Sequence, residues 1–295
     1  MYILGLNVYH GDSSACLYKD GKLICAFEEE RFTRKKHWAG FPVLAIKECL
    51  KEAGISIKEV DYITASRNPR ENFAKKMWHA VRHQVSFEGI KQRLNNSSKA
   101  GSLENEFAKH FDLPTAFFIK RIHNIEHHRS HLASAFFASP FQESAILSID
   151  AFGDFCSTML ATGKDNQITV IDKVLFPHSI GIFYTAFTQY LGFVYYGDEY
   201  KVMGLAPYGE AKYVEKVKNV LRFLPNGLYT WNDEYFVQPT KAGFKYENNI
   251  PSVGNLYSAK FKELFGEPRT AKEELSQYHK DLAASVQRVT EELIF

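Results

Sequence analysis

The chain has 295 residues, with 36 basic and 34 acidic side chains and a formal net charge of +2. This balance gives no overall electrostatic reason to bind nucleic acid or an anionic membrane. Hydrophobic residues make up 45% of the chain, with 24 Phe and 16 Tyr, which excludes a disordered protein. The length exceeds the roughly 100 to 200 residues of one ordinary domain, so we expect two lobes.

The N-terminal segment predicts a strand and not a targeting sequence. Residues 2–8 are apolar and follow Met1 without a basic segment or a cleavage-site pattern. No apolar run approaches the roughly 20 residues that cross a membrane. The 4 cysteines show no Cys-x-x-Cys spacing and lie in apolar runs, which is typical of reduced thiols. We therefore expect a cytoplasmic protein.

The first elements predict an antiparallel sheet followed by a helix. Three β-rich runs open the chain, at residues 3–9, 14–19 and 22–27. Asp20-Gly21 between the second and third is a strong signal for a tight hairpin turn. Residues 43–53 then show helical spacing that stops at Gly54, a plausible C-cap. Residues 62–65 predict a buried fourth strand.

A similar order of elements starts again in the second half. Residues 145–149 predict a strand that ends in Asp150, and residues 158–162 and 168–175 flank a polar turn. Strand, acidic loop, hairpin and helix thus occur twice, which indicates an internal duplication. The predicted fold class is α/β, with two actin- or Hsp70-like (ribonuclease H-like) lobes at residues 1–143 and 144–295.

Two further segments give specific expectations. The polar stretch at residues 93–102 predicts a surface loop between helical segments. A last helix is expected from residue 271 to residue 295, without a stop signal at its end, so we expect the second lobe to be incomplete. Its apolar positions should then be partly exposed: Leu275, Leu282, Val286, Val289 and Leu293.

The segment Glu126-His127-His128-Arg129-Ser130-His131 is the strongest chemical signal. Residues four apart share one helix face, so His127 and His131 can present two imidazoles to one Zn, Fe, Ni or Cu ion. Asp150, at the end of the following strand, could add a carboxylate. The alternative is a helix with two ordinary histidines, because His79 and His83 have the same spacing.

Two loops and a basic run could handle phosphate. Gly153 and Asp154 follow Asp150 in an acidic turn that could hold a cation or a phosphate, or be an ordinary turn. In the first loop, His10 and Asp12 could supply a general base, although His10 could equally cap a turn.

The basic run, residues 31–37, follows the third predicted strand. Arg31 and Lys36 lie within it and could clamp an anionic substrate, or the run could be a solvated loop.

Several long stretches, taken together and in this order, resemble a family of O-carbamoyltransferases that act in nodulation and antibiotic tailoring. They are HGDSSACLYKDGKL, FEEERFTRKKHWAGFP, EHHRSHLASAFFASPF, SIDAFGD, SIGIFYTAFTQYLGF, GDEYKVMGLAPYG and the closing LAASVQRVTEE. The resemblance covers nearly the whole chain. It implies the N-terminal module of such an enzyme, similar to the universal tRNA threonylcarbamoyl-transfer protein.

The resemblance also implies a reaction and its cofactors. A second domain, absent here, would make carbamoyl-adenylate from carbamoyl phosphate and ATP. The present module would move the carbamoyl group to a hydroxyl of a sugar or other small acceptor. Its metal, Fe(II), would be held by His127, His131 and Asp150, with a further aspartate beyond the end of this chain.

In this reading His10 would be the general base and Asp12 its neighbour. Gly11 and Ala151 depart from the family's pattern at these two loops.

Three other functions stay open. They are an ATP-dependent small-molecule kinase of the same fold class, tRNA threonylcarbamoyl transfer, and an inactive nucleotide-binding fragment. The near-neutral charge and the aromatic segment at residues 183–200 favour a small organic acceptor over tRNA. As further partners we expect a second copy of the chain, in a homodimer, or a missing C-terminal half.

Overall fold

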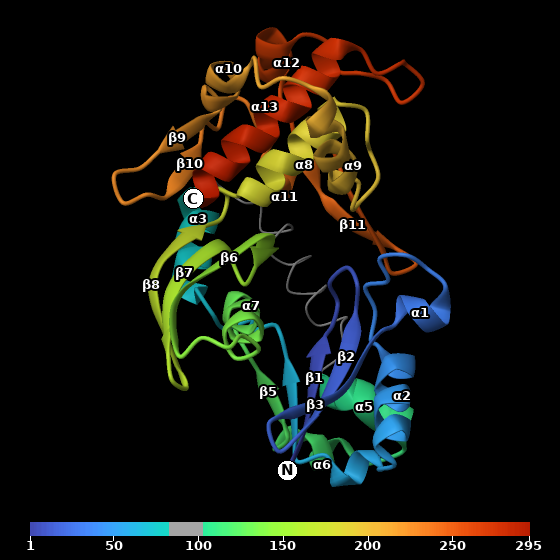
Figure 1. Ribbon diagram of the computed structural model, residues 1–295. Helices are drawn as coiled ribbons and strands as arrows, with labels where there is room; N and C mark the ends of the chain where they lie inside the picture. The colour runs from blue at the N-terminus through green and yellow to red at the C-terminus, as the bar shows by residue number, and fades with distance from the viewer. Residues whose placement is uncertain (83–102) are drawn as a thin grey trace. The chain divides into compact units, whose positions relative to one another are not determined.

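The computed structural model describes residues 1–82 and 103–295, so the predicted loop at residues 93–102 lies outside the described residues. The chain divides into two compact units (Figure 1). The first contains Met1–Ser130 and Tyr246–Pro251, and the second contains His131–Lys245 and Ser252–Phe295. The first boundary thus precedes the expected one, after residue 143, and passes through a helix.

The first unit is built on a sheet with the strand order β3-β2-β1-β4-β5. Its strands are β1 (Tyr2–Asn7), β2 (Ser14–Lys19), β3 (Lys22–Glu28), β4 (Tyr62–Ala65) and β5 (Ile122–Asn124). The first three are antiparallel, and β4 and β5 join them in parallel. The turn between β2 and β3 has positive φ at both Asp20 and Gly21, as the sequence predicts for a tight hairpin.

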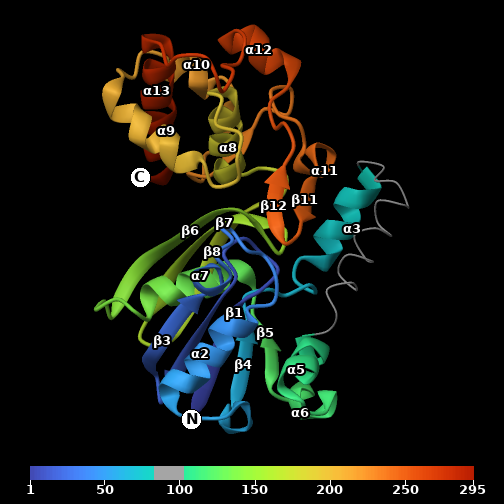
Figure 2. The same cartoon turned by 90° about the vertical axis from the view of Figure 1, so that its right-hand side faces the viewer.

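The helical segments of the first unit are α1 (Glu30–Thr33), α2 (Val43–Ala53), η1 (Ile57–Glu59), α3 (Phe73–Arg82), α5 (Leu103–Phe111) and α6 (Thr115–Ile119). Of these, α2, η1, α5 and α6 contribute buried side chains to the core of the sheet. The predicted helix α2 ends at Gly54 in a left-handed C-cap, and its buried Ile46 and Cys49 pack with Leu17 of β2. Phe107 of α5 and Phe118 of α6 complete the same core. Both helices lie beside β5 (Figure 2).

The second unit begins with a helix on an antiparallel sheet. The elements are α7 (His127–Phe136), β6 (Glu143–Gly153), β7 (Cys156–Lys164) and β8 (Gln167–Leu175), with strand order β6-β7-β8. Leu132 and Phe136 of α7 are buried in one cluster with Ile146 and Met159 of the sheet. Figure 1 shows α7 beside these strands. Three antiparallel strands followed by helices therefore occur in both units, as predicted.

The remainder of the second unit is largely helical. Its elements are α8 (Ile180–Tyr190), α9 (Glu199–Leu205), η2 (Ala206–Tyr208), α10 (Val214–Lys218), β9 (Leu221–Phe223), β10 (Tyr229–Trp231), α11 (Pro239–Ala242), α12 (Ala259–Phe265) and α13 (Gln277–Ile294). The hairpin of β11 (Phe244–Glu247) and β12 (Ile250–Val253) crosses the boundary, because Tyr246–Pro251 belong to the first unit. An aromatic core formed by α8 and α12 includes Phe183, Phe187 and Phe261.

The last helix differs from the expectation in its start and its burial. α13 begins after a capping box at Ser276 and not at residue 271. Leu282, Val286 and Val289 are fully buried in the second unit, so the expectation of exposed side chains is wrong for these three. Leu275, which precedes the helix, is 36% exposed. Contacts with α8, α9 and α10 account for the burial of this helix face.

Two other sequence predictions can be compared with the structure. All the cysteines are free thiols, with Cys49 and Cys156 buried. Among the residues that the structure describes, no helix combines the length and apolarity that a membrane crossing requires.

Candidate metal centre

The histidine pair lies on α7, which the second unit's sheet holds in place. Phe136 packs so closely on Gly163 of β7 that a Cβ at this glycine would lie 2.7 Å from three ring atoms. The boundary between the two units runs through α7, but the helix is continuous, so His127 and His131 share one face of a single element. The packing of Phe136 therefore holds the backbone of α7, on which both histidines lie.

A hydrogen bond sets the tautomer of His127. Its Nδ1 lies 3.1 Å from the carbonyl oxygen of Ser66, and the side chain is buried, with 5% exposure. A carbonyl oxygen can only accept, so Nδ1 must carry a proton and Nε2 is left as the coordinating atom. Metal-binding histidines commonly have such a second partner, because it orients the ring.

Asp150 completes the cluster from the end of β6. Its Oδ2 lies 3.6 Å from Nε2 of His131, and one ligand atom each from His127, His131 and Asp150 lie within 4.8 Å of one another. His131 is 50% exposed and Asp150 is 38% exposed. A bound ion would thus have two accessible ligands and one buried ligand, which leaves coordination positions open to a substrate.

Residues at the start of α8 contact the backbone of Asp150. Ser179, the N-cap of α8, donates its hydroxyl to the backbone carbonyl of Asp150 at 3.0 Å and accepts from Ile182 N. A Cβ at Gly181 would lie only 2.8 Å from Ala151 N and 2.9 Å from Asp150 C. The carboxylate in turn accepts from Ala151 N at 2.6 Å. Ala151, where the family's pattern suggests glycine, is thus compatible with this turn.

The donor set fits the ion that the resemblance implies. Two imidazoles and one carboxylate with open positions are the donor set of non-haem Fe(II) sites, and they also suit Zn. Mg would be a poor fit, because it takes oxygen ligands. Without an ion, His131 and Asp150 can still form an ordinary ion pair when the imidazole is protonated.

The first loop places the two predicted catalytic residues against different partners. The His10 ring lies against the His127 ring, with centroids 5.0 Å apart. Asp12 instead contacts His37, with Oδ1 and Nδ1 at 3.0 Å. Burial raises the pKa of the neighbouring Tyr9 to about 12, so its hydroxyl keeps its proton at neutral pH. The contact of His37 with Asp12 was not recognised from the sequence, where His37 is the last residue of the basic run.

The expected phosphate-binding residues belong to two different units, Arg31 and Lys36 to the first and Gly153 and Asp154 to the second. Arg31 is 71% exposed and pairs with Glu28 at 3.3 Å, and Lys36 is also exposed. Asp154 and Phe155, both with positive φ, form the two-residue turn that joins β6 to β7 after the buried Gly153. These contacts match the simpler alternatives, a solvated basic loop and an ordinary turn, and a role in phosphate binding stays a prediction.

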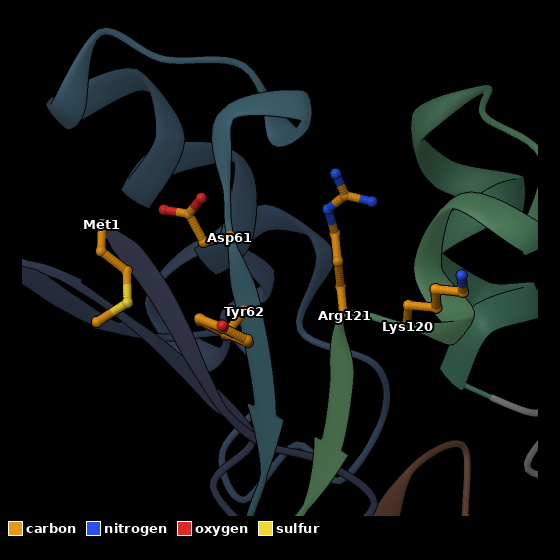
Figure 3. A pocket seen from close by; sticks show the side chains of 5 residues that line it. All are labelled: Met1, Asp61, Tyr62, Lys120 and Arg121. Atoms are coloured by element: carbon orange, nitrogen blue, oxygen red, sulfur yellow. The ribbon is translucent and has the colours of Figure 1, made fainter.

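A separate pocket lies in the first unit (Figure 3). It is open, and it is lined by Met1, Asp61, Tyr62, Lys120 and Arg121. The carboxylate of Asp61 accepts from Tyr2 N at 2.7 Å, and Arg121 donates to the carbonyl of Phe117 at 2.9 Å. None of the residues predicted to carry chemistry lines this pocket, so we do not assign the function to it.

Fold and site together define a mixed α/β protein that directs two histidines and an aspartate at one point. The chain belongs to the family described as Carbamoyltransferase N-terminus, whose model matches residues 2–295. An uncharacterized protein of Synechocystis, sll1178, is 42% identical to it over 99% of this chain and 47% of its own length. The nodulation protein NolNO of Sinorhizobium fredii is 33% identical over 98% of this chain and 38% of its own length.

The chain therefore spans less than half the length of either relative. Among solved structures, YeaZ from Pseudomonas aeruginosa matches 60% of this chain and 67% of its own chain, with 15% identity and a TM-score of 0.31.

Proposed function

We propose that this chain is the metal-binding transfer module of a carbamoyltransferase. In this proposal it moves a carbamoyl group from carbamoyl-adenylate, made elsewhere from carbamoyl phosphate and ATP, to a hydroxyl of a sugar or another small molecule. The observation that carries the proposal is the convergence of His127, His131 and Asp150 in a chain of this family. The repeated three-stranded arrangement supports an actin-like origin of both units.

Each proposed ligand has a structural feature suited to its role. His127 is buried and has its tautomer fixed by Ser66, so it is the rigid ligand. His131 and Asp150 are accessible, and Ser179 holds the backbone of Asp150. A divalent metal such as Fe(II), when bound, supplies Lewis acidity that polarises a carbonyl and neutralises charge on a departing phosphate.

The proton of the acceptor hydroxyl requires a base. His10, whose ring lies beside that of His127 in the first unit, is our candidate for it. An imidazole suits this role because its ordinary pKa lies near the pH of most cells. Asp12 contacts His37 and not His10, so we assign Asp12 no direct part in orienting this base.

The test compares His131→Ala with a matched histidine control. His110 is a suitable control because it, like His131, pairs with a carboxylate. Its partner is Glu106, at 3.5 Å, and His110 belongs to no potential metal cluster among the described residues. Purified protein would be loaded anaerobically with Fe(II) and its metal content measured. It would then be incubated with labelled carbamoyl-adenylate, ATP and a panel of sugars.

We expect His131→Ala to lose both the bound metal and carbamoyl transfer, while His110→Ala retains both. Wild-type transfer by His131→Ala would contradict the assigned centre. The mass of the product separates this function from the kinase alternative, because a phosphorylated acceptor would replace the carbamoylated one. The isolated chain should show no transfer from carbamoyl phosphate, since it would depend on carbamoyl-adenylate supplied from elsewhere.

A further inference from the structure

A second group of potential metal ligands lies wholly within the first unit. One ligand atom each from Asp12, Glu30 and His37 lie within 4.8 Å of one another. Asp12 follows β1, Glu30 starts α1, and His37 follows α1. None of these residues belongs to the centre on α7 and β6.

The distances within this group are close to those around a small cation. Oδ1 of Asp12 lies 3.0 Å from Nδ1 of His37, and a carboxylate oxygen of Glu30 accepts from the backbone N of His37 at 3.0 Å. Two ligands at about 2.0 to 2.2 Å from a tetrahedral ion are roughly 3.3 to 3.6 Å apart. The distance between Asp12 Oδ1 and His37 Nδ1 is slightly shorter than this spacing, and a ligand atom of Glu30 lies within 4.8 Å of both residues' ligand atoms, so side-chain movements alone would bring all three groups to an ion.

Backbone interactions hold the two contributing loops together. The fully buried Ser13 donates its N–H to the carbonyl of Trp38 at 2.8 Å and its hydroxyl to the carbonyl of Gly40 at 2.8 Å. Asp12 and His37 both have left-handed backbones, with φ of 63° and 57°. Such conformations are uncommon outside glycine, and a fixed loop geometry is needed to maintain them.

The charges of the group favour a cation. Asp12 and Glu30 bring two carboxylates together, and like charges at such a distance repel unless a positive charge lies among them. Of the neighbouring basic residues, Arg31 pairs with Glu28 and Lys35 lies over the Trp38 ring, 5.3 Å from its centre.

The same two loops also contain unsatisfied polar atoms. The hydroxyl of Tyr9 and Nε1 of Trp38 are buried without a hydrogen-bond partner among the described residues. Buried polar atoms rarely lack partners, and exceptions often accompany functional regions.

We propose that Asp12, Glu30 and His37 form a second site for a divalent transition-metal ion, with Zn²⁺ or Mn²⁺ as the class of ligand. One imidazole and two carboxylates suit these ions. Mg²⁺ would bind poorly to this group, because it takes oxygen ligands and one of the three ligands is an imidazole nitrogen. The cation stabilises the contact between the β1–β2 loop and the segment after α1. This inference does not depend on the proposed carbamoyl transfer.

The experiment measures how many ions the chain binds. Equilibrium dialysis against Zn²⁺, and titration with Co²⁺ followed by its visible absorption, would be performed on wild type, His37→Gln, Asp12→Asn, His131→Ala and the double variant of His37 and His131. Glutamine at position 37 can still donate to Asp12 but is a poor ligand. His110→Ala is the control, and circular dichroism verifies the fold of each variant.

We expect wild type and the control to bind about two equivalents of Zn²⁺, and His37→Gln, Asp12→Asn and His131→Ala about one each. The double variant should bind none. Unchanged stoichiometry in both His37→Gln and Asp12→Asn would overturn the proposal and leave a purely hydrogen-bonded cluster. If His37→Gln does not fold, Asp12→Asn decides the question alone. If the proposed centre on α7 and β6 binds no metal, only the effect of His131→Ala on the number of bound ions disappears. That outcome can therefore be told apart from a failure of the second site.

Discussion

Replacing Gly181 with alanine tests whether the close approach of α8 to β6 positions Asp150. The new Cβ would lie 2.8 Å from Ala151 N and 2.9 Å from both C and O of Asp150, where ordinary contacts begin near 3.4 Å. All three atoms are backbone, so no side chain can rotate away. The start of α8 or the end of β6 must therefore shift by a few tenths of an ångström or more.

The size of the effect follows from two opposing terms. Overpacking of this kind costs about 1 to 3 kcal/mol. Alanine in a helix is more favourable than glycine by up to about 1 kcal/mol, and less in the first turn. We expect a net loss of about 1 to 2 kcal/mol in the free energy of unfolding. Because Asp150 moves, the affinity for Co²⁺ at this centre should fall about 10- to 100-fold, as for other changes behind a metal ligand.

Gly204→Ala is the matched control. Gly204 lies in α9, and a Cβ there would meet nothing within 4 Å. The same chemical change should raise the free energy of unfolding by about 0.5 to 1 kcal/mol and leave Co²⁺ binding unaltered. Urea denaturation followed by circular dichroism, together with Co²⁺ titration, measures both quantities. If Gly181→Ala is as stable as Gly204→Ala and binds Co²⁺ with wild-type affinity, the assigned role of this contact is refuted.

Three further predictions concern the second unit. Tyr229→Phe removes the buried hydroxyl that accepts from Ile180 N at 2.9 Å, so it should cost about 1 to 3 kcal/mol in urea denaturation, and a neutral result would contradict the assigned bond. Gly209→Ala should destabilise the fold more than Gly204→Ala does, because its Cβ would collide with the backbone carbonyl of Lys280, and equal stability of the two variants would argue against this packing. Burial lowers the pKa of His178 in the folded state, so its contribution to stability is complete above the ordinary value of about 6.5 and is lost as the pH falls through the folded pKa. His178→Gln should therefore flatten the pH dependence of stability below that value, and identical profiles for variant and wild type would show that His178 does not contribute.

The sequence predicted those features that depend on local chemistry. The Asp20-Gly21 turn has positive φ at both residues, and Gly54 ends α2 with a left-handed cap, because few other residues adopt these conformations at low cost. The spacing of His127 and His131 likewise needed only the period of a helix. The beginning of α13 was misjudged, since a capping box at Ser276 competes with the apolar pattern upstream of it.

Tertiary structure alone decided which distant side chains meet. The contact of Asp12 with His37 joins residues from two loops, and no periodic pattern links their positions. The close packing of Gly181 on the turn at Asp150 depends on where α8 lies after the β7–β8 hairpin. The burial of Val286 depends on the packing of α13 against other helices. Local propensity determines elements and their ends, whereas contacts between elements depend on the chain path that packing selects.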